Sequence, residues 1–283
     1  MPRDRTVGWV GTDQRGRPDL SSIDPADFRG RDMLPGLDQG RHYEHAPIVQ
    51  AILELRVMTP DDLIMEDLEA LNFGQDYADP TTLYHLQGQL TFSEEGSVAS
   101  EPQRDHVGFG FAREDGTRVI QVGLRRFAFI WSGEYTHWGE FSTEAEAAWL
   151  AYKGAARVVS VERVGVRFVN QIRLPEGHVE IKDYLRTSVD ISAYLPQAVS
   201  SMFFQVEIPI VELDAGATVT SALMSEGDSQ ALLLDIDVKT STVLSTEDEA
   251  FDVGARGTLD RLRFAKNYVF EACITDATRG LIG

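Results

Sequence analysis

The stretch Val161–Leu174, VERVGVRFVNQIRL, is the longest clean alternation of apolar and polar residues in the chain, and Pro175 follows it. A period of two residues is typical of a β-strand with one buried face. The polar face carries three arginines and an amide: Arg163, Arg167, Gln171 and Arg173. The stretch lies at mid-chain after a predicted helix, so we expect a central strand that opens a second structural unit.

The elements on either side of this strand have a common order. In the first half, an alternating strand ends at Thr59-Pro60, a helix and several antiparallel strands follow, and a long helix comes last. The second half repeats that order, ending in a helix from Thr258. We therefore predict an α+β fold of two similar strand–helix–antiparallel sheet–helix modules, residues 43–159 and 160–283. They pack as a pseudo-duplicate in one compact unit, and their sheets either stack or continue each other.

Three local signals predict where elements begin and turn. Thr59 before Pro60 is typical of a helix start, with proline in the first helical position. Thr143 and Glu146 have the spacing of a capping box, which predicts a helix start there. The parity of the apolar positions breaks at Gly123–Arg126, as it does in a β-bulge.

Residues 1–42 form a separate region at the N-terminus. They contain glycine, proline and alternating charges but no sustained periodicity. Such composition predicts an extended or disordered arm, or one that wraps another surface. Its isolated apolar residues Trp9, Phe28 and Leu34 are candidate anchors for a partner.

The bulk composition excludes several classes of function. The chain has 283 residues and a net charge of −19, which argues against nonspecific binding to nucleic acid or to an anionic membrane. The single cysteine, Cys273, excludes an internal disulfide framework. The sequence shows no signal peptide and no apolar run long enough to cross a bilayer, so we expect a cytoplasmic protein.

Residues that could carry chemistry are few. The chain lacks a glycine-rich phosphate motif, a metalloprotease motif and a nucleophile elbow, so we expect no cofactor and name no catalytic residue. Asp235 and Asp237 share one face of a predicted strand, and Glu207 joins them if its strand is adjacent. Such carboxylates suit a divalent cation, but a solvated or ion-paired sheet face is the interpretation that we favour for them.

The arginine-rich face of the central strand also has two interpretations. Arg163, Arg167, Arg173 and Gln171 would hold an anionic ligand in a groove between the modules. Alternatively, the arginines pair with carboxylates of neighbouring strands, for which the candidates are Glu54, Asp235 and Asp237.

A cluster of aromatic residues lies between a predicted strand and helix and includes Tyr135, His137 and Trp138. Such residues are enriched in binding hot spots, so they are candidates for partner contact. Packing beneath the following helix is the alternative.

Three stretches resemble a sporadically distributed, functionally uncharacterised bacterial family. The first is Ala46–Arg56, APIVQAILELR; the second is the central motif Val161–Pro175; the third is Leu262–Thr275, LRFAKNYVFEACIT. The resemblance covers residues 45–280 and implies no activity and no catalytic residue. Its patchy distribution is similar to that of phage-defence and toxin–antitoxin genes.

These observations lead to three hypotheses of function. The first is a non-enzymatic binding subunit that docks a protein encoded by a neighbouring gene, in a phage-defence or toxin-neutralising system. The second is a sensor of a small anionic ligand or nucleotide, and the third a metal-dependent hydrolase at Asp235 and Asp237. A homo-oligomer is compatible with each of them.

Overall fold

The computed structural model describes residues 41–283 apart from 88–89, 94–95, 100–102, 178–179, 193, 198, 227–228, 241–242 and 249–250. Trp9, Phe28 and Leu34, with nearly all of the predicted N-terminal arm, lie outside the described residues.

The described chain is a mixed α+β structure. Its main sheet contains β1 (Ile48–Met58), β2 (Thr81–Gln87), β5 (Gln103–Ala112), β6 (Arg118–Gly123), β7 (Arg126–Ser132), β8 (Ser160–Arg173), β9 (Phe203–Ile210), β10 (Ala215–Glu226), β11 (Ser229–Thr240) and β12 (Leu244–Ser245). A small hairpin contains β3 (Leu90–Ser93) and β4 (Gly96–Ala99). The helices are α1 (Trp138–Ala155), α2 (Ile181–Tyr184), α3 (Phe251–Cys273) and α4 (Asp276–Ile282), with short 3₁₀ turns η2 (Met65–Leu68) and η3 (Val211–Leu213).

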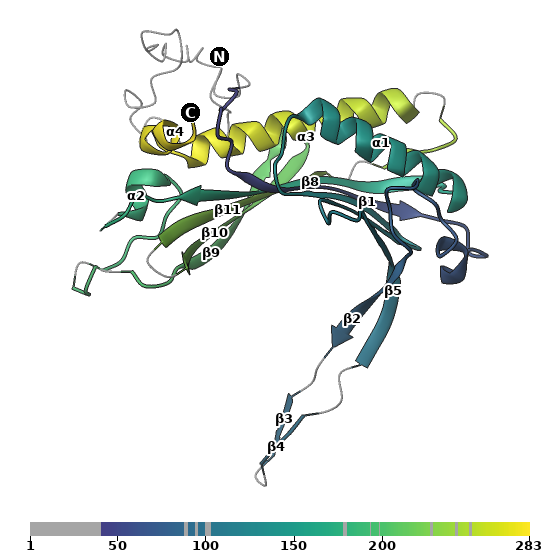
Figure 1. Cartoon of the computed structure of the whole chain (residues 1–283), viewed down its shortest axis with the longest axis horizontal. Helices are drawn as coiled ribbons and strands as arrows, with labels where there is room; N and C mark the ends of the chain where they lie inside the picture. Colours follow the sequence, from purple (N-terminus) through teal and green to yellow (C-terminus); the bar gives the residue numbers. More distant parts are fainter. Residues whose placement is uncertain are drawn as a thin grey trace, which may run out of the picture.

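One antiparallel sheet runs through the whole molecule in the order β2-β5-β6-β7-β1-β8-β11-β10-β9, with β12 paired to the end of β8 (Figure 1). The predicted central strand is confirmed as β8, which lies between β1 and β11. Pro209 predicts an edge position for its strand, and β9 is the edge strand. The two expected sheets therefore continue each other in the described chain and do not stack.

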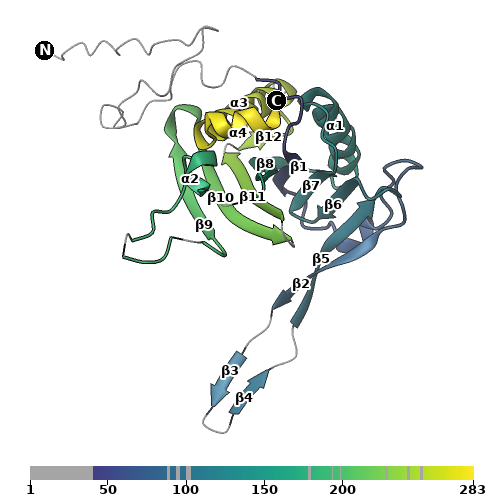
Figure 2. The ribbon, with the colours of Figure 1, turned by 60° about the vertical axis from the view of Figure 1, so that its left-hand side comes forward.

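The core lies between this sheet and the helices. On β1, Ala51, Leu53 and Leu55 are buried, and their cross-strand partners on β8 are the buried Phe168, Val166 and Val164. Helix α1 covers β7, and α3 covers β8 and β11, so both long helices lie on the same face of the sheet (Figures 1 and 2). Successive side chains of a strand point to opposite faces of the sheet, and the helices cover only one of these faces. This explains the alternation of apolar and polar residues in the sequence.

The helix starts predicted at Thr59 and Thr143 differ from the structure. After Thr59 and Pro60 the chain forms only the short turn η2, because the Thr59 hydroxyl donates to the carbonyl of Leu124 (2.8 Å) and does not cap a helix. Helix α1 begins at Trp138, before the expected Thr143, since the His137 ring caps it. The predicted capping box is therefore wrong, and Thr143 instead donates to the carbonyl of Gly139.

Two further boundaries, the turn between β6 and β7 and the start of α3, also differ from the sequence prediction. Gly123 pairs directly with Arg126, so the expected bulge is a two-residue hairpin turn between β6 and β7. Helix α3 begins at Phe251 and not at Thr258, although Gly254 and Gly257 lie in its first turns. Phe251 is buried against the core, and this burial offsets the low helix propensity of glycine.

Strands β2 and β5 lead away from the body of the molecule, and the β3–β4 hairpin lies at the end of this projection (Figures 1 and 2). None of the helices in the described chain combines the length and apolar character needed to span a bilayer.

Candidate functional site

The helices leave the second face of the main sheet uncovered in the described chain. In Figure 1 this face is concave and turned away from α1 and α3. It carries the polar set of the predicted central strand together with the matching residues of its neighbours. Across β7, β1, β8 and β11 these include Arg126, Glu54, Arg56, Arg163, Arg167, Asp235, Asp237 and Lys239.

Arg167 makes the most complete ion pair on this face. Its Nε lies 2.9 and 3.0 Å from the two carboxylate oxygens of Asp235, and its Nη2 lies 2.5 Å from Oδ2. The Asp235 side chain is 8% exposed, whereas that of Arg167 is 49% exposed. This geometry favours the second interpretation of Arg167, pairing within the sheet.

Glu54 joins two arginines on neighbouring strands. Its Oε2 accepts from Nε of Arg126 on β7 (2.9 Å), and its Oε1 contacts the guanidinium group of Arg163 on β8. Burial raises the pKa of the Glu54 carboxyl group, but the two guanidinium groups outweigh burial, and the net pKa shift is downward.

A third arginine lies between these two. Arg56 on β1 is directly opposite Arg126 on one side and Arg163 on the other. It is exposed and makes no ion pair with another described residue. Glu54 pairs with Arg126 and Arg163 but not with Arg56, so the middle arginine of three in direct register has no paired carboxylate among the described residues of a protein of net charge −19. In addition, the buried Nε of Arg163 has no hydrogen-bond partner within the described chain. We call Arg56, Arg126 and Arg163 the arginine row.

Sequence reasoning named only Arg163 of this row. Arg56 and Arg126 are ordinary polar positions on their own strands, and their importance comes from cross-strand register. The strand alternation correctly predicts which sheet face Arg56 and Arg126 occupy. It does not predict the register that places the three strands' arginines side by side. Arg173 and Gln171 lie farther along β8, opposite Ala231 and Leu233.

The candidate metal residues do not form a cluster of three. Asp235 is occupied by Arg167, and β10 separates β9, which carries Glu207, from β11. Burial raises the pKa of Asp237 and outweighs the opposing effects of Lys239 and the arginines. Among the described residues, no group of three or more histidine, cysteine, aspartate and glutamate side chains could hold a metal ion.

The predicted aromatic loop contributes mainly to packing. Tyr135 contacts Phe168 edge to face, with ring centroids 5.5 Å apart, and Trp138 stacks on the same ring at 6.4 Å. The Nδ1 atom of His137 accepts from the backbone N–H of Glu140 (3.1 Å) at the start of α1. Because Tyr135 and Trp138 are only partly buried, contact with a partner stays a prediction for them.

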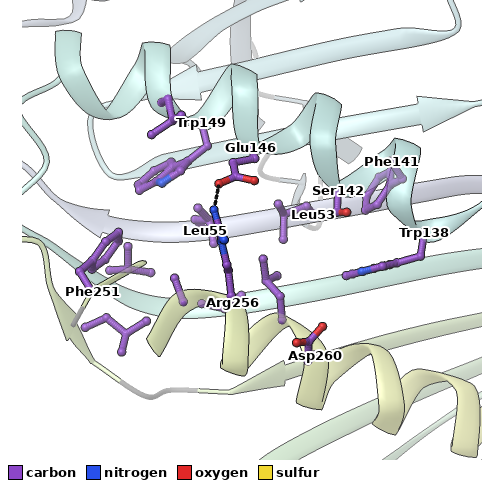
Figure 3. A pocket seen from close by; sticks show the side chains of 16 residues that line it. Leu53, Leu55, Trp138, Phe141, Ser142, Glu146, Trp149, Phe251, Arg256 and Asp260 are labelled. Atoms are coloured by element: carbon purple, nitrogen blue, oxygen red, sulfur yellow. Dashed lines mark hydrogen bonds and ion pairs between the residues drawn. The ribbon is translucent and has the colours of Figure 1, made fainter. Parts of the chain in front are cut away.

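A groove of about 390 Å³ lies between α1 and α3, above the junction of β1 and β8. Its walls are mainly apolar, with Leu53 and Leu55 at the base and Trp149 and Phe251 at one end (Figure 3). The Arg256–Glu146 ion pair (3.1 Å) connects the two helices across the groove (Figure 3). The arginines of β8 lie on the opposite face of the sheet, so they do not line this groove.

The search against protein-family models found no match to the chain, and the comparison with curated proteins found none either. The resemblance drawn from the three sequence motifs therefore stays a prediction.

Proposed function

We propose that the protein is a non-enzymatic binding subunit, and that its uncovered sheet face docks an acidic segment of a protein partner. The observation that carries this proposal is the arginine row. Like charges placed directly opposite one another in a sheet are unfavourable, and Arg56 has a like charge on both sides. Binding of a partner's carboxylates to this site would reduce the electrostatic repulsion among the three arginines.

The other end of the same face supports a protein as the occupant. Phe203 is 72% exposed on β9, and Met224 is 46% exposed on β10. The cross-strand register places Phe203 in line with Ala222, Leu233 and Gln171. Arg163 and Gln171 are eight residues apart on β8, or about 26 Å along the strand. A basic end and an apolar end at this distance suit a folded partner or an extended segment better than a small ion.

We also propose that the sheet is a pseudo-duplicate. Outward from β1 the order is β7, β6, β5, β2, and outward from β8 it is β11, β10, β9, so the halves match except for the additional strand β2. The first strand of the first half, β1, pairs with β7, the last strand before α1; in the second half β8 pairs with β11 and with the two-residue β12 that precedes α3. The arginine row then lies beside the junction of the two halves, where duplicated modules commonly form sites.

The partner would be the product of a neighbouring gene, as in phage-defence and toxin–antitoxin systems. The test is co-expression of the chain with each neighbouring product, followed by size-exclusion chromatography and calorimetry. We expect one product to form a stable complex whose affinity falls as salt rises from about 0.05 to about 0.3 M, because screening weakens pairing between exposed charges.

The matched variants are Arg56→Glu and Arg261→Glu. Both make the same change of charge, but Arg261 is exposed on α3, on the other side of the sheet. We expect Arg56→Glu to weaken the complex about tenfold or more and Arg261→Glu to leave it nearly unchanged. A complex equally affected by both variants, or absent with every neighbouring product, would contradict the proposal.

A further inference from the structure

A second site lies on the helical side of the sheet, away from the arginine row. The segment before β1, the β7–α1 loop and α3 line an open pocket of about 560 Å³. All three stretches that carry the family resemblance contribute to its walls, through Pro47, Asn170 and Lys266 among others. A cavity of this size holds a small organic ligand.

Two cations on α3 line this pocket without an ion pair in the described chain. Lys266 and Arg263 are one helical turn apart, and neither makes an ion pair with a described carboxylate. The Lys266 Nζ lies 4.0 Å from the centroid of the Phe168 ring, and the Arg263 guanidinium carbon lies 5.7 Å from that of Trp138.

Arg41, the other arginine of the pocket, differs from Arg263 because it makes an ion pair. Arg41 lies 3.7 Å from the carboxylate of Glu271, which also accepts from Arg279 (3.0 Å) and from the Tyr43 hydroxyl (2.5 Å). Asp276, whose carboxylate lies 2.6 Å from Arg279, is the second anion of this cluster, which therefore contains two cations and two carboxylates. The charges of Lys266 and Arg263 are therefore the ones available to a ligand.

The pKa of Lys266 is consistent with an ammonium group that has no paired carboxylate in the described chain. Burial lowers its pKa to about 7, and Arg263 adds to the effect. A bound anion would favour the charged ammonium group and raise this pKa. The titratable and charged groups around the pocket are Arg41, His42, Tyr43, Glu44, His45, Glu134, Tyr135, His137, Arg263 and Glu271.

The opposite wall supplies further recognition. Helix α1 begins there, and because the His137 ring already accepts from the N–H of Glu140, the N–H groups of Trp138 and Gly139 are the first-turn donors left without an acceptor in the helix. Such groups favour oxyanions. The aromatic rings of Tyr43, Tyr135, Trp138 and Phe270 line the same pocket and offer surfaces for a planar ring.

We propose that this pocket binds a small phosphate monoester that carries a planar ring, of the size of a nucleoside monophosphate. The phosphate lies between Lys266, Arg263 and the first turn of α1, and the ring lies against the aromatic wall. A dianionic phosphate matches two neighbouring cations, and a lysine with an arginine supplies both a point charge and a planar fork of donors.

The test is calorimetric titration of the full chain with AMP, with adenosine and inorganic phosphate as comparison ligands. We expect AMP to bind with a stoichiometry of one and more tightly than either comparison ligand. Lys266→Met keeps an apolar stem on Phe168 without the charge and should weaken AMP binding about tenfold or more. Arg263→Met, at an exposed position of the same pocket, should weaken it as well, whereas Arg261→Met, at an exposed position of α3 that does not line the pocket, should not.

The pH dependence gives a separate readout. Between about pH 7 and pH 9 wild-type affinity should fall as Lys266 loses its proton, whereas Lys266→Arg should keep its affinity because arginine stays charged. Absence of AMP binding, equal binding of inorganic phosphate, or affinity unchanged in both methionine variants would overturn the proposal. None of these outcomes bears on the docking of a protein at the arginine row.

Discussion

At the scale of single residues, two carboxylates on the uncovered sheet face respond to their surroundings in opposite ways. Glu54 lies between Arg126 and Arg163, and these cations lower its pKa despite burial. Burial raises the pKa of Asp237 by more than the nearby basic side chains lower it, so the net pKa shift is upward. The difference follows from geometry: Glu54 contacts two guanidinium groups directly, whereas Asp235 takes the contacts of Arg167 that could have served Asp237.

The opposite shifts predict opposite pH dependences. A lowered folded-state pKa stabilises the protein above the unfolded value near 4.3, and the gain is lost as pH falls through the folded value. Glu54→Gln should therefore destabilise the protein at neutral pH, with the difference from wild type fading in acid. Asp237→Asn should instead stabilise it at neutral pH, and that gain should vanish below the unfolded value near 3.9. Urea unfolding of both variants across this pH range measures the two differences; curves of the same sign would contradict the assignment.

The ion pair of Arg167 and Asp235 predicts an asymmetry between its partners. Removal of Arg167 leaves an almost buried carboxylate unpaired, whereas removal of the Asp235 charge leaves an arginine that is half exposed and can be hydrated. We expect Arg167→Met to cost about 2–3 kcal/mol of unfolding free energy, and Asp235→Asn to cost less. Denaturant unfolding at neutral pH measures both, and a larger cost for Asp235→Asn would contradict this account.

At the scale of elements, the strands were predictable, whereas the starts of α1 and α3 were not. Alternation identified β1, β8 and β11, because one buried and one open face impose a period of two along each strand. The start of α1 could not be predicted, since its cap is a histidine ring and not the expected Thr143. The turn after Thr59 depends on a hydrogen bond to Leu124, which is distant in sequence, and no local signal reports it.

The candidate site was predictable only in part for the same reason. Composition and alternation placed Arg163 and Arg167 on an open face and named Glu54 and Asp235 as pairing partners. Which arginines become neighbours depends on the register of β7, β1 and β8. Register is a property of strand pairs, so Arg56 and Arg126 were not identified.

Glycine positions in the sheet give a prediction at this scale. A Cβ added at Gly108 on β5 would lie 2.0 Å from the carbonyl oxygen of Val122, whereas one added at Gly165 on β8 would meet nothing closer than 3.7 Å. We expect Gly108→Ala to cost about 3 kcal/mol, and Gly165→Ala to be neutral or to stabilise by about 0.5 kcal/mol. Thermal and urea unfolding measure both. Equal costs would contradict the described approach of β5 to β6.

At the scale of the whole molecule, the central pairing of β1 with β8 makes the two halves one folding unit. The strands pair along nearly their full length, and the core residues of each half lie against the other across this pair. Either half alone would expose the edge of β1 or β8 that the strand of the other half now covers.

This continuity predicts a single cooperative transition. Calorimetry of the full chain should show one peak, with calorimetric and van't Hoff enthalpies in agreement. Residues 43–159 and 160–283 expressed separately should fail to fold, and should regain structure when they are co-expressed. Two separated peaks, or an independently folded half with its own sharp transition, would contradict the account.

The whole sheet also separates the two proposed activities. The helical face carries the pocket of Lys266, and the uncovered face carries the arginine row. We propose that the arginine row serves an acidic partner, although it lowers the stability of the free protein. Like charges directly opposite in a sheet cost stability, so relief of the conflict should be measurable without any partner.

The most direct measurement is therefore the unfolding free energy of Arg56→Thr at low salt, compared with wild type and with Arg173→Thr. Arg173 is an exposed arginine of the same face whose cross-strand neighbour on β11 is Ala231. The account predicts that Arg56→Thr stabilises the free protein by about 0.5–1 kcal/mol more than Arg173→Thr, and that added salt reduces this difference. A destabilised Arg56→Thr variant would contradict it, because Arg56 would then be part of the structural ion-pair network.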